Sequence, residues 1–139
     1  MSLETKTLYL VMVAFMSIIA PLSFPSLSCA ETVSARLYQT GGSMTFIDIN
    51  LTPPAPPTLI VEMKLPPGSK IIKAKPPLSK QNKKDNTIKW LLKKVKGKSF
   101  TIQLVTQTKL DLGSTTVHIR YRNRDSGSLK EIEAVSVSQ

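Results

Sequence analysis

From residue 33 onward the chain consists of short runs in which apolar and polar residues alternate, and most runs end near proline, glycine or asparagine. In the run 44–51, for example, Ile47 and Ile49 alternate with Asp48. Period two is typical of a β-strand, because successive side chains point to opposite faces of a sheet. Pro53 and the prolines after it end this run, since proline lacks the N–H that a sheet ladder needs. The pattern therefore predicts strands separated by tight turns.

The same reading gives about eight strands in all, at residues 33–38, 44–51, 59–65, 70–74, 88–93, 100–105, 117–122 and 129–137. The segment 76–86 is polar, rich in lysine and without periodicity, so we expect a loop there. No long helical pattern lies between the runs. Regularly spaced strands of this kind indicate an all-β fold, a single antiparallel sandwich or a barrel.

One segment fits two structures. Its apolar residues also fall at the spacing of a helix, at positions 88, 91, 92 and 95, and Gly97 would suit the end of that helix. As a strand, the segment instead buries Trp90 between Ile88 and Leu92. We favour the strand, with Trp90 as a core anchor, and keep a helix over 88–96 as the alternative.

The first thirty residues differ from the rest. Lys6 precedes an almost wholly apolar run, 8–27, and Ser28-Cys29-Ala30 supplies the small residues at which a signal peptidase cuts. This pattern predicts a signal peptide over residues 1–30, cleaved after Ala30, and one domain over residues 31–139. The protein would then be extracytoplasmic: periplasmic, at the cell surface or secreted. A retained membrane anchor and lipid attachment at Cys29 are the alternatives.

Residues 31–139 contain no cysteine, and His118 is the single histidine. Without disulfides the fold must depend on its hydrophobic core. With one histidine and no cysteine, no Ser-His-Asp or Cys-His arrangement is evident and no His/Cys metal cluster can form, and no glycine-rich phosphate loop is present. We therefore expect no catalytic residue, no metal and no cofactor, and a protein that is not an enzyme.

The strongest functional signal is positive charge. The chain has a formal net charge of +10, and twelve lysines face a single acid between Lys64 and Lys98. Four residues of one parity would form a ladder on the outer face of the strand 117–122, and five lysines lie in or beside the loop 76–86. These nine are the candidate anion-binding residues: His118, Arg120, Arg122, Arg124, Lys73, Lys75, Lys80, Lys83 and Lys84. The alternative is a solvated outer face whose arginines pair with Glu131 or Glu133.

Several segments also match a known pattern in order: the apolar strand Leu59–Leu65 with the turn Pro66-Pro67-Gly68, then Ile88–Leu92 with Lys96-Gly97-Lys98, then Phe100–Gln107, and then Gly113 with the strand to Tyr121. This order resembles bacterial secreted Ig-like domains, related in architecture to cohesin and to conserved-repeat surface modules. The resemblance implies a single Ig-like antiparallel β-sandwich used in surface assembly, adhesion or docking. It carries over no catalytic or ligand-binding residue, and the lysine density departs from the family.

Three functions follow as hypotheses. The leading one is a non-enzymatic binding or assembly module that contacts an anionic polysaccharide or lipid surface, or another envelope protein. The second is a homo-oligomeric fibre subunit whose strand 33–38 pairs with the sheet edge of the next molecule. The third is a membrane-active protein that uses 83–98 as a basic amphipathic helix. Nucleic acid is disfavoured, because Trp90 is the one nearby aromatic residue and is expected in the core.

Overall fold

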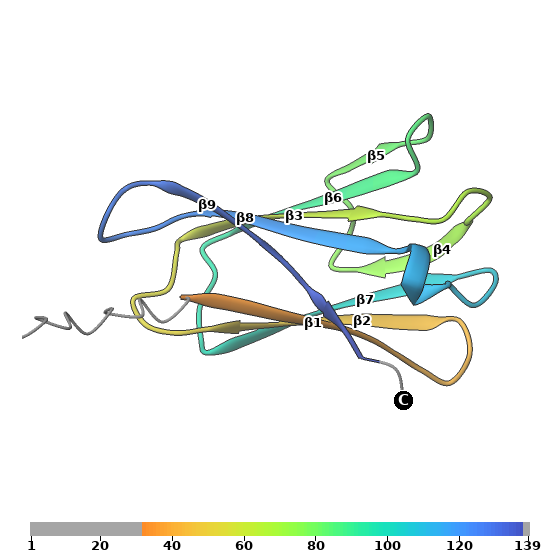
Figure 1. Ribbon diagram of the computed structural model, residues 1–139, viewed down its shortest axis with the longest axis horizontal. Coiled ribbons are helices and arrows are strands. Elements are labelled where there is room, and N and C mark those ends of the chain that lie inside the picture. Colours follow the sequence, from red (N-terminus) through yellow and green to blue (C-terminus); the bar gives the residue numbers. More distant parts are fainter. Residues whose placement is uncertain (1–31, 138–139) are drawn as a thin grey trace, which may run out of the picture.

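The computed structural model describes residues 32–137, which form two five-stranded sheets packed face to face (Figure 1). The first sheet has the order β10-β1-β2-β7-β4, and the second has the order β5-β6-β3-β8-β9. The predicted β-sandwich is confirmed, with ten strands in the described part of the chain where about eight were expected. The predicted signal peptide and Cys29 lie outside the described residues.

The strands are β1 (Val33–Thr40), β2 (Met44–Leu51), β3 (Thr58–Lys64), β4 (Ile71–Lys75), β5 (Lys80–Asn82), β6 (Thr87–Lys93), β7 (Ser99–Thr106), β8 (Thr116–Arg122), β9 (Leu129–Glu133) and β10 (Val135–Ser136). A short 3-10 helix, η2 (Leu112–Ser114), precedes β8. Within residues 32–137, no helix has the length and apolar character needed to cross a membrane.

The core lies between the sheets and is built from the apolar parity of each strand. Trp90 is 1 % exposed, and its indole N–H donates a hydrogen bond to the Pro76 carbonyl at 3.0 Å. The strand interpretation of this segment is therefore confirmed, and a helix over 88–96 is wrong. The same observation removes the basic amphipathic helix over 83–98, because those residues form the β5–β6 turn, β6 and the β6–β7 turn.

Two boundaries differ from the prediction. The segment 76–86 contains β5, which pairs with the edge of β6 although Lys80, Gln81 and Asn82 are all exposed. The closing run 129–137 is two strands: β9 pairs with β8 in the second sheet, and β10 pairs in parallel with β1 in the first. Figure 1 shows the chain crossing between the sheets, and buried Ala134 lies at the crossing, its N–H donating to Val117 O.

The first strand is integrated into its own sheet. β1 pairs with β2 along all eight residues, from Val33↔Leu51 to Thr40↔Met44, and β10 covers its other side at Arg36 and Leu37. Strand exchange between molecules through residues 33–38 would therefore have to replace pairings that the molecule already makes internally.

The sandwich has two ends, which the strand directions define. Val33 lies at the N-terminal end, together with the turns 52–57, 94–98 and 123–128. The turns 41–43, 65–70 and 83–86 and the connection 107–115 lie at the distal end. At that end Gly41 and Gly42 close the β1–β2 hairpin with φ of 57° and 84°, a region that favours glycine.

Candidate functional site

The outer face of the second sheet carries the predicted cation ladder. Val117, Ile119 and Tyr121 are buried, so His118 and Arg120 point outward as their parity predicts, and Arg122 is exposed at the end of β8. Arg124 lies in the β8–β9 turn, beyond the strand. The predicted outward orientation is thus confirmed for His118, Arg120 and Arg122. The prediction that Arg124 continues the ladder is wrong, because the chain turns at Asn123.

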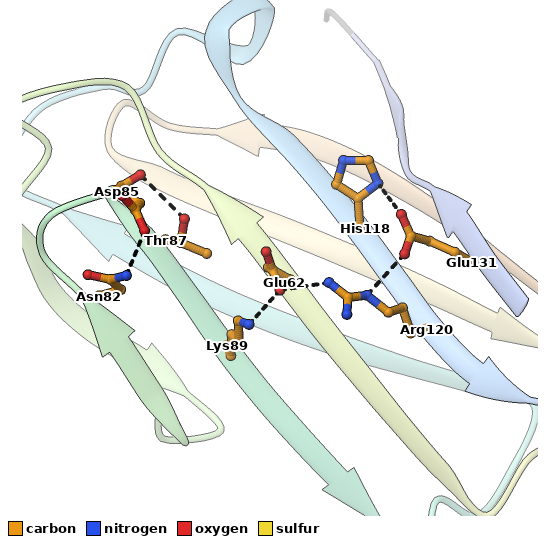
Figure 2. Close-up of polar contacts among 8 residues, drawn as sticks. All are labelled: Glu62, Asn82, Asp85, Thr87, Lys89, His118, Arg120 and Glu131. Atoms are coloured by element: carbon orange, nitrogen blue, oxygen red, sulfur yellow. Dashed lines mark hydrogen bonds and ion pairs between the residues drawn. The ribbon is translucent and has the colours of Figure 1, made fainter. Parts of the chain in front are cut away.

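Two of these side chains, His118 and Arg120, lie against carboxylates of neighbouring strands (Figure 2). Glu62 Oε2 lies 2.8 Å from Lys89 Nζ and 3.1 Å from Arg120 Nη2. Arg120 Nε lies 3.0 Å from Glu131 Oε2 as an ion pair without the alignment of a hydrogen bond, and His118 Nδ1 lies 3.3 Å from Glu131 Oε1. Two carboxylates therefore bridge three basic side chains across four strands.

The electrostatics of Glu62 agree with this arrangement. The hydrogen bond from Lys89 lowers the pKa of Glu62 below its ordinary 4.5, against a smaller opposing effect of burial, and the charges of Lys89, Arg120 and His118 add to the lowering. The carboxylate is thus stabilised in its charged form, and it offsets positive charge on this face. Glu131 was expected as a partner, whereas Glu62 was not, because it lies on β3, 58 residues from Arg120 in sequence.

The predicted lysines are spread over the molecule. Lys80 is on β5 opposite Lys89, and Lys83 and Lys84 lie exposed in the turn at the distal end. Lys73 and Lys75 belong to the other sheet, on β4. The structure therefore does not bring the five lysines together in one patch.

The outer face of the first sheet has a different chemistry. Phe46 on β2 pairs with Tyr38 on β1, and their rings stack at a centroid distance of 5.4 Å and an interplanar angle of 16°. On its other side Phe46 pairs with Gln103 of β7, which pairs with Lys75 of β4. One row of directly opposed residues thus crosses four strands, from Tyr38 through Phe46 and Gln103 to Lys75.

A second row lies beside the first. Asp48 pairs with Arg36 on one side and with Thr101 on the other, and Thr101 Oγ1 donates to Asp48 Oδ1 at 2.7 Å. Burial raises the pKa of Tyr38 above its ordinary 10.0, and a hydrogen bond to Asp48 and the charge of that carboxylate raise it further. Asp48 therefore lies close enough to Tyr38 to oppose ionisation of its phenol.

A groove of about 540 Å³ at the edge of this sheet continues the aromatic pair. The β4–β7 ladder ends at Lys75↔Gln103, so the start of β7 has no partner on that side and Phe100 is only half-buried. The groove is lined by Phe46, Lys75, Pro76, Pro77, Phe100, Thr101 and Gln103. We call the two rows and this groove the aromatic face.

Sequence reasoning missed the aromatic face, although a signal was present. Phe46 and Tyr38 occupy the outward parity of their strands, where polar residues are expected. The Gly41-Gly42 hairpin makes Thr40 and Met44 partners, and counting back along both strands sets Tyr38 opposite Phe46. The described residues hold no group of three His, Cys, Asp or Glu side chains that could bind a metal ion.

Comparison with known proteins gives little further information. No family model matches the sequence, and no curated protein does. A crystal structure of ChBD2 from Thermococcus kodakarensis KOD1 aligns over 70% of this chain and 91% of that chain, with 14% identity and a TM-score of 0.41. A likeness of this extent supports no inference about function, so the function is argued from the faces of the sandwich.

Proposed function

We propose that the domain is a non-enzymatic binding module that holds a polysaccharide chain on its aromatic face. The observation that carries this proposal is the stacked pair of Tyr38 and Phe46 on the outer side of a sheet, continuous with the groove beside Phe46. Large apolar side chains on an outer face, accompanied by a few polar groups, are typical of binding sites.

The chemistry of the face suits a sugar chain. A pyranose ring presents apolar C–H groups on its faces and hydroxyl groups around its rim. Tyr38 and Phe46 offer flat surfaces to the former, while Gln103 and Thr101 offer hydrogen-bond donors and acceptors to the latter. With strands about 4.8 Å apart, the row from Tyr38 to Lys75 extends about 14 Å, enough for several linked rings.

The charge beside the face favours an acidic polysaccharide. Lys75 ends the aromatic row, and Lys73 lies next to it on the same side of β4, opposite Val105. Both lysines are exposed, and no salt bridge engages them in the described part of the chain. A uronate carboxylate or a sulfate would place its charge there. Of the predicted anion-binding residues, these two are therefore the ones we assign to the site.

The compartment is part of the proposal. Cleavage after Ala30, or lipid attachment at Cys29, would place residues 31–139 outside the cytoplasm, where such polymers occur. We also place the domain with Ig-like surface modules, on the segment order described above. The fibre-subunit alternative is less favoured, because β1 is already paired on both sides.

The decisive experiment is calorimetric titration with alginate, heparin and dextran, which represent carboxylated, sulfated and neutral chains. Phe46→Ala should weaken binding of the acidic chains at least tenfold, because it removes one of two stacked rings. Leu91→Ala is the matched control: Leu91 is an apolar residue, 43% exposed, on the outer face of the other sheet. It should leave binding unchanged. Equal losses in the two variants, or no binding of any of the three polymers, would overturn the proposal.

A further inference from the structure

The N-terminal end of the sandwich carries a second concentration of charge, separate from the aromatic face. β6 and the turn after it supply four lysines, while the end of β8 and the turn after it supply two arginines. All six side chains are exposed: Lys93, Lys94, Lys96, Lys98, Arg122 and Arg124. No salt bridge of the described residues engages any of them. We call these six the basic end; Asp125 is the single acid in its two turns.

Strand pairing brings the two halves of the basic end together. Leu59 of β3 pairs with Leu92 on one side and Tyr121 on the other. Lys93 and Arg122 therefore follow on either side of the next β3 residue, Thr58, on the outer face. Two strand spacings separate them, which is about 10 Å.

The turn 94–98 extends the charge from one sheet to the other. It leaves β6 in the second sheet and enters β7 in the first. Backbone hydrogen bonds hold both of its sides, from Val95 N–H to Pro57 O at 3.4 Å and from Leu51 N–H to Lys98 O at 2.8 Å. The lysines of this turn thus lie on a fixed support across the end of the sandwich.

One residue of the turn is strained. Lys94 has φ of 55°, in the left-handed region that glycine or asparagine adopts at lower cost. A charged residue kept in such a conformation suggests that its side chain has a use. Lys94 therefore supports a binding role for this end that does not depend on net charge alone.

The position of the basic end indicates the partner. The chain enters the sandwich here: Thr32 O accepts from Thr52 N–H at 2.8 Å, and Val33 begins β1. Only four residues, 28–31, separate the apolar run 8–27 from Thr32, and the five steps from residue 27 to Thr32 reach at most about 18 Å. If that run is inserted in a bilayer, before cleavage or permanently, this end of the sandwich lies beside the lipid headgroups.

We propose that the basic end binds the anionic headgroups of a phospholipid bilayer. The sandwich then stands with its N-terminal end on the membrane, and the aromatic face is directed sideways and remains free for a polysaccharide. Lys and Arg near an anionic leaflet each contribute to binding within about a Debye length. The inference is independent of the polysaccharide proposal, because no residue is shared between the two surfaces.

The test is co-sedimentation with vesicles of equal parts phosphatidylglycerol and phosphatidylcholine, compared with phosphatidylcholine alone. The whole described core lies between Val33 and Ala134, so residues 31–139 are used, with circular dichroism to confirm the fold. The wild-type domain should bind the anionic vesicles, and added salt should weaken this binding. Lys94→Gln with Lys96→Gln, and separately Arg122→Gln with Arg124→Gln, should each lower the vesicle affinity about tenfold or more.

The matched control is Lys83→Gln with Lys84→Gln, the same loss of charge at the distal end. It should change the vesicle affinity less than about threefold, because those residues lie at the opposite end of the sandwich. An equal loss in the control would show attraction by net charge alone and overturn the proposal. So would binding that ignores phosphatidylglycerol, or basic-end variants that lose heparin affinity but keep vesicle affinity. Phe46→Ala should leave vesicle binding intact, which separates failure here from failure of the polysaccharide site.

Discussion

The two outer faces of this sandwich differ in how their polar residues are used. On the second sheet, Glu62 and Glu131 bridge Lys89, Arg120 and His118, so much of the charge is balanced inside the molecule. On the first sheet, a stacked pair of aromatic rings lies beside the Asp48–Thr101 hydrogen bond, and Lys75 is exposed at the end of their row. The second sheet carries the charge that is most evident in the sequence, and much of that charge is already paired within the molecule.

This difference bears on how basic strands should be interpreted. Arginines of one parity on a strand predict an outward ladder, but whether that ladder is available to a ligand depends on acids from neighbouring strands. Large apolar residues at outward positions carry more information where they line a groove, as Phe46 does, because scattered exposed apolar residues are common on protein surfaces. The predictions below test this contrast, starting with the largest expected effect.

The largest expected change in the free energy of unfolding comes from the core between the two sheets. Trp90→Ala should lower the free energy of unfolding by about 3–5 kcal/mol, because it empties a fully buried aromatic site and removes the hydrogen bond to Pro76 O. Chemical denaturation followed by circular dichroism measures it. A loss below about 1 kcal/mol would mean that Trp90 is not a core anchor, and the inward and outward parity of β6 would have to be reassigned.

Removing the carboxylates that pair with Lys89 and Arg120 is the most direct test of the difference between the two outer faces. Glu62→Gln with Glu131→Gln should cost about 1 kcal/mol of stability at most, since exposed ion pairs contribute little. It should also raise the affinity for heparin at low salt several-fold, because Arg120 and Lys89 lose their internal partners. Asp85→Asn is a control that removes an acid from the distal turn. If the double variant binds heparin no better than this control does, then the internal ion pairs are not what limits heparin binding by the outer face of the second sheet.

The stability of the protein at acid pH should show the contribution of the Glu62 ion pairs. Its pKa is lowered in the folded state, so the carboxylate stabilises the fold above its ordinary pKa of 4.5, and this contribution disappears as the pH falls through the lower, folded value. The stability difference between the wild type and Glu62→Gln should therefore be constant near neutral pH and shrink in acid. Urea denaturation over a pH series measures it. A difference that grows on acidification would contradict the assigned direction.

These variants also indicate what the sequence could and could not predict. The alternation of apolar and polar residues was sufficient for β2, β3 and β8, because each of them buries one face, whereas β6 also fitted a helix and was decided by the expected burial of Trp90. It was insufficient for β5, an exposed edge strand without an apolar residue, and for the crossing at Ala134, which depends on packing against the other sheet. Local patterns do not encode these features.

The sites show the same division. The outward direction of Arg120 follows from its parity, but its contact with Glu62 depends on a β3–β8 register that joins residues 58 apart. The Tyr38–Phe46 pair lies within one hairpin, so its register could be worked out from the Gly41-Gly42 turn. The groove could not be, because it forms where β4 leaves β7 and Pro76 leads away toward the other sheet.

On the first sheet, the titration of Tyr38 should report the aromatic face. Burial, followed by Asp48, raises its pKa above 10.0, so Tyr38 should ionise at higher pH than a free tyrosine. Because the folded pKa is raised, the contribution to stability is complete below the ordinary pKa and is lost as the pH rises through the folded value. Ultraviolet absorbance of tyrosinate, with Tyr38→Phe as the subtraction, measures the pKa. Asp48→Asn should lower it only in part, since burial is the larger cause; an unchanged value would mean that Asp48 does not act on the Tyr38 phenol.

The smallest effect concerns two lysines, Lys89 on β6 and Lys94 in the turn that follows β6. Lys89 is paired with Glu62, whereas Lys94 has a left-handed backbone and no salt bridge among the described residues. Lys94→Gly should therefore leave the free energy of unfolding within about 1 kcal/mol of the wild type, because relief of the left-handed strain is offset by the greater freedom of glycine in the unfolded chain. It should still weaken binding to anionic vesicles, because it removes the charge of Lys94. Lys94→Ala separates the two effects, since it removes the charge but keeps the strain, and should be no more stable than the wild type.

Thermal denaturation and co-sedimentation of the same samples give both quantities. If Lys94→Gly kept the full vesicle affinity, the strained lysine would have no role at the basic end, and the charge of that end would be solvated surface like Lys83 and Lys84.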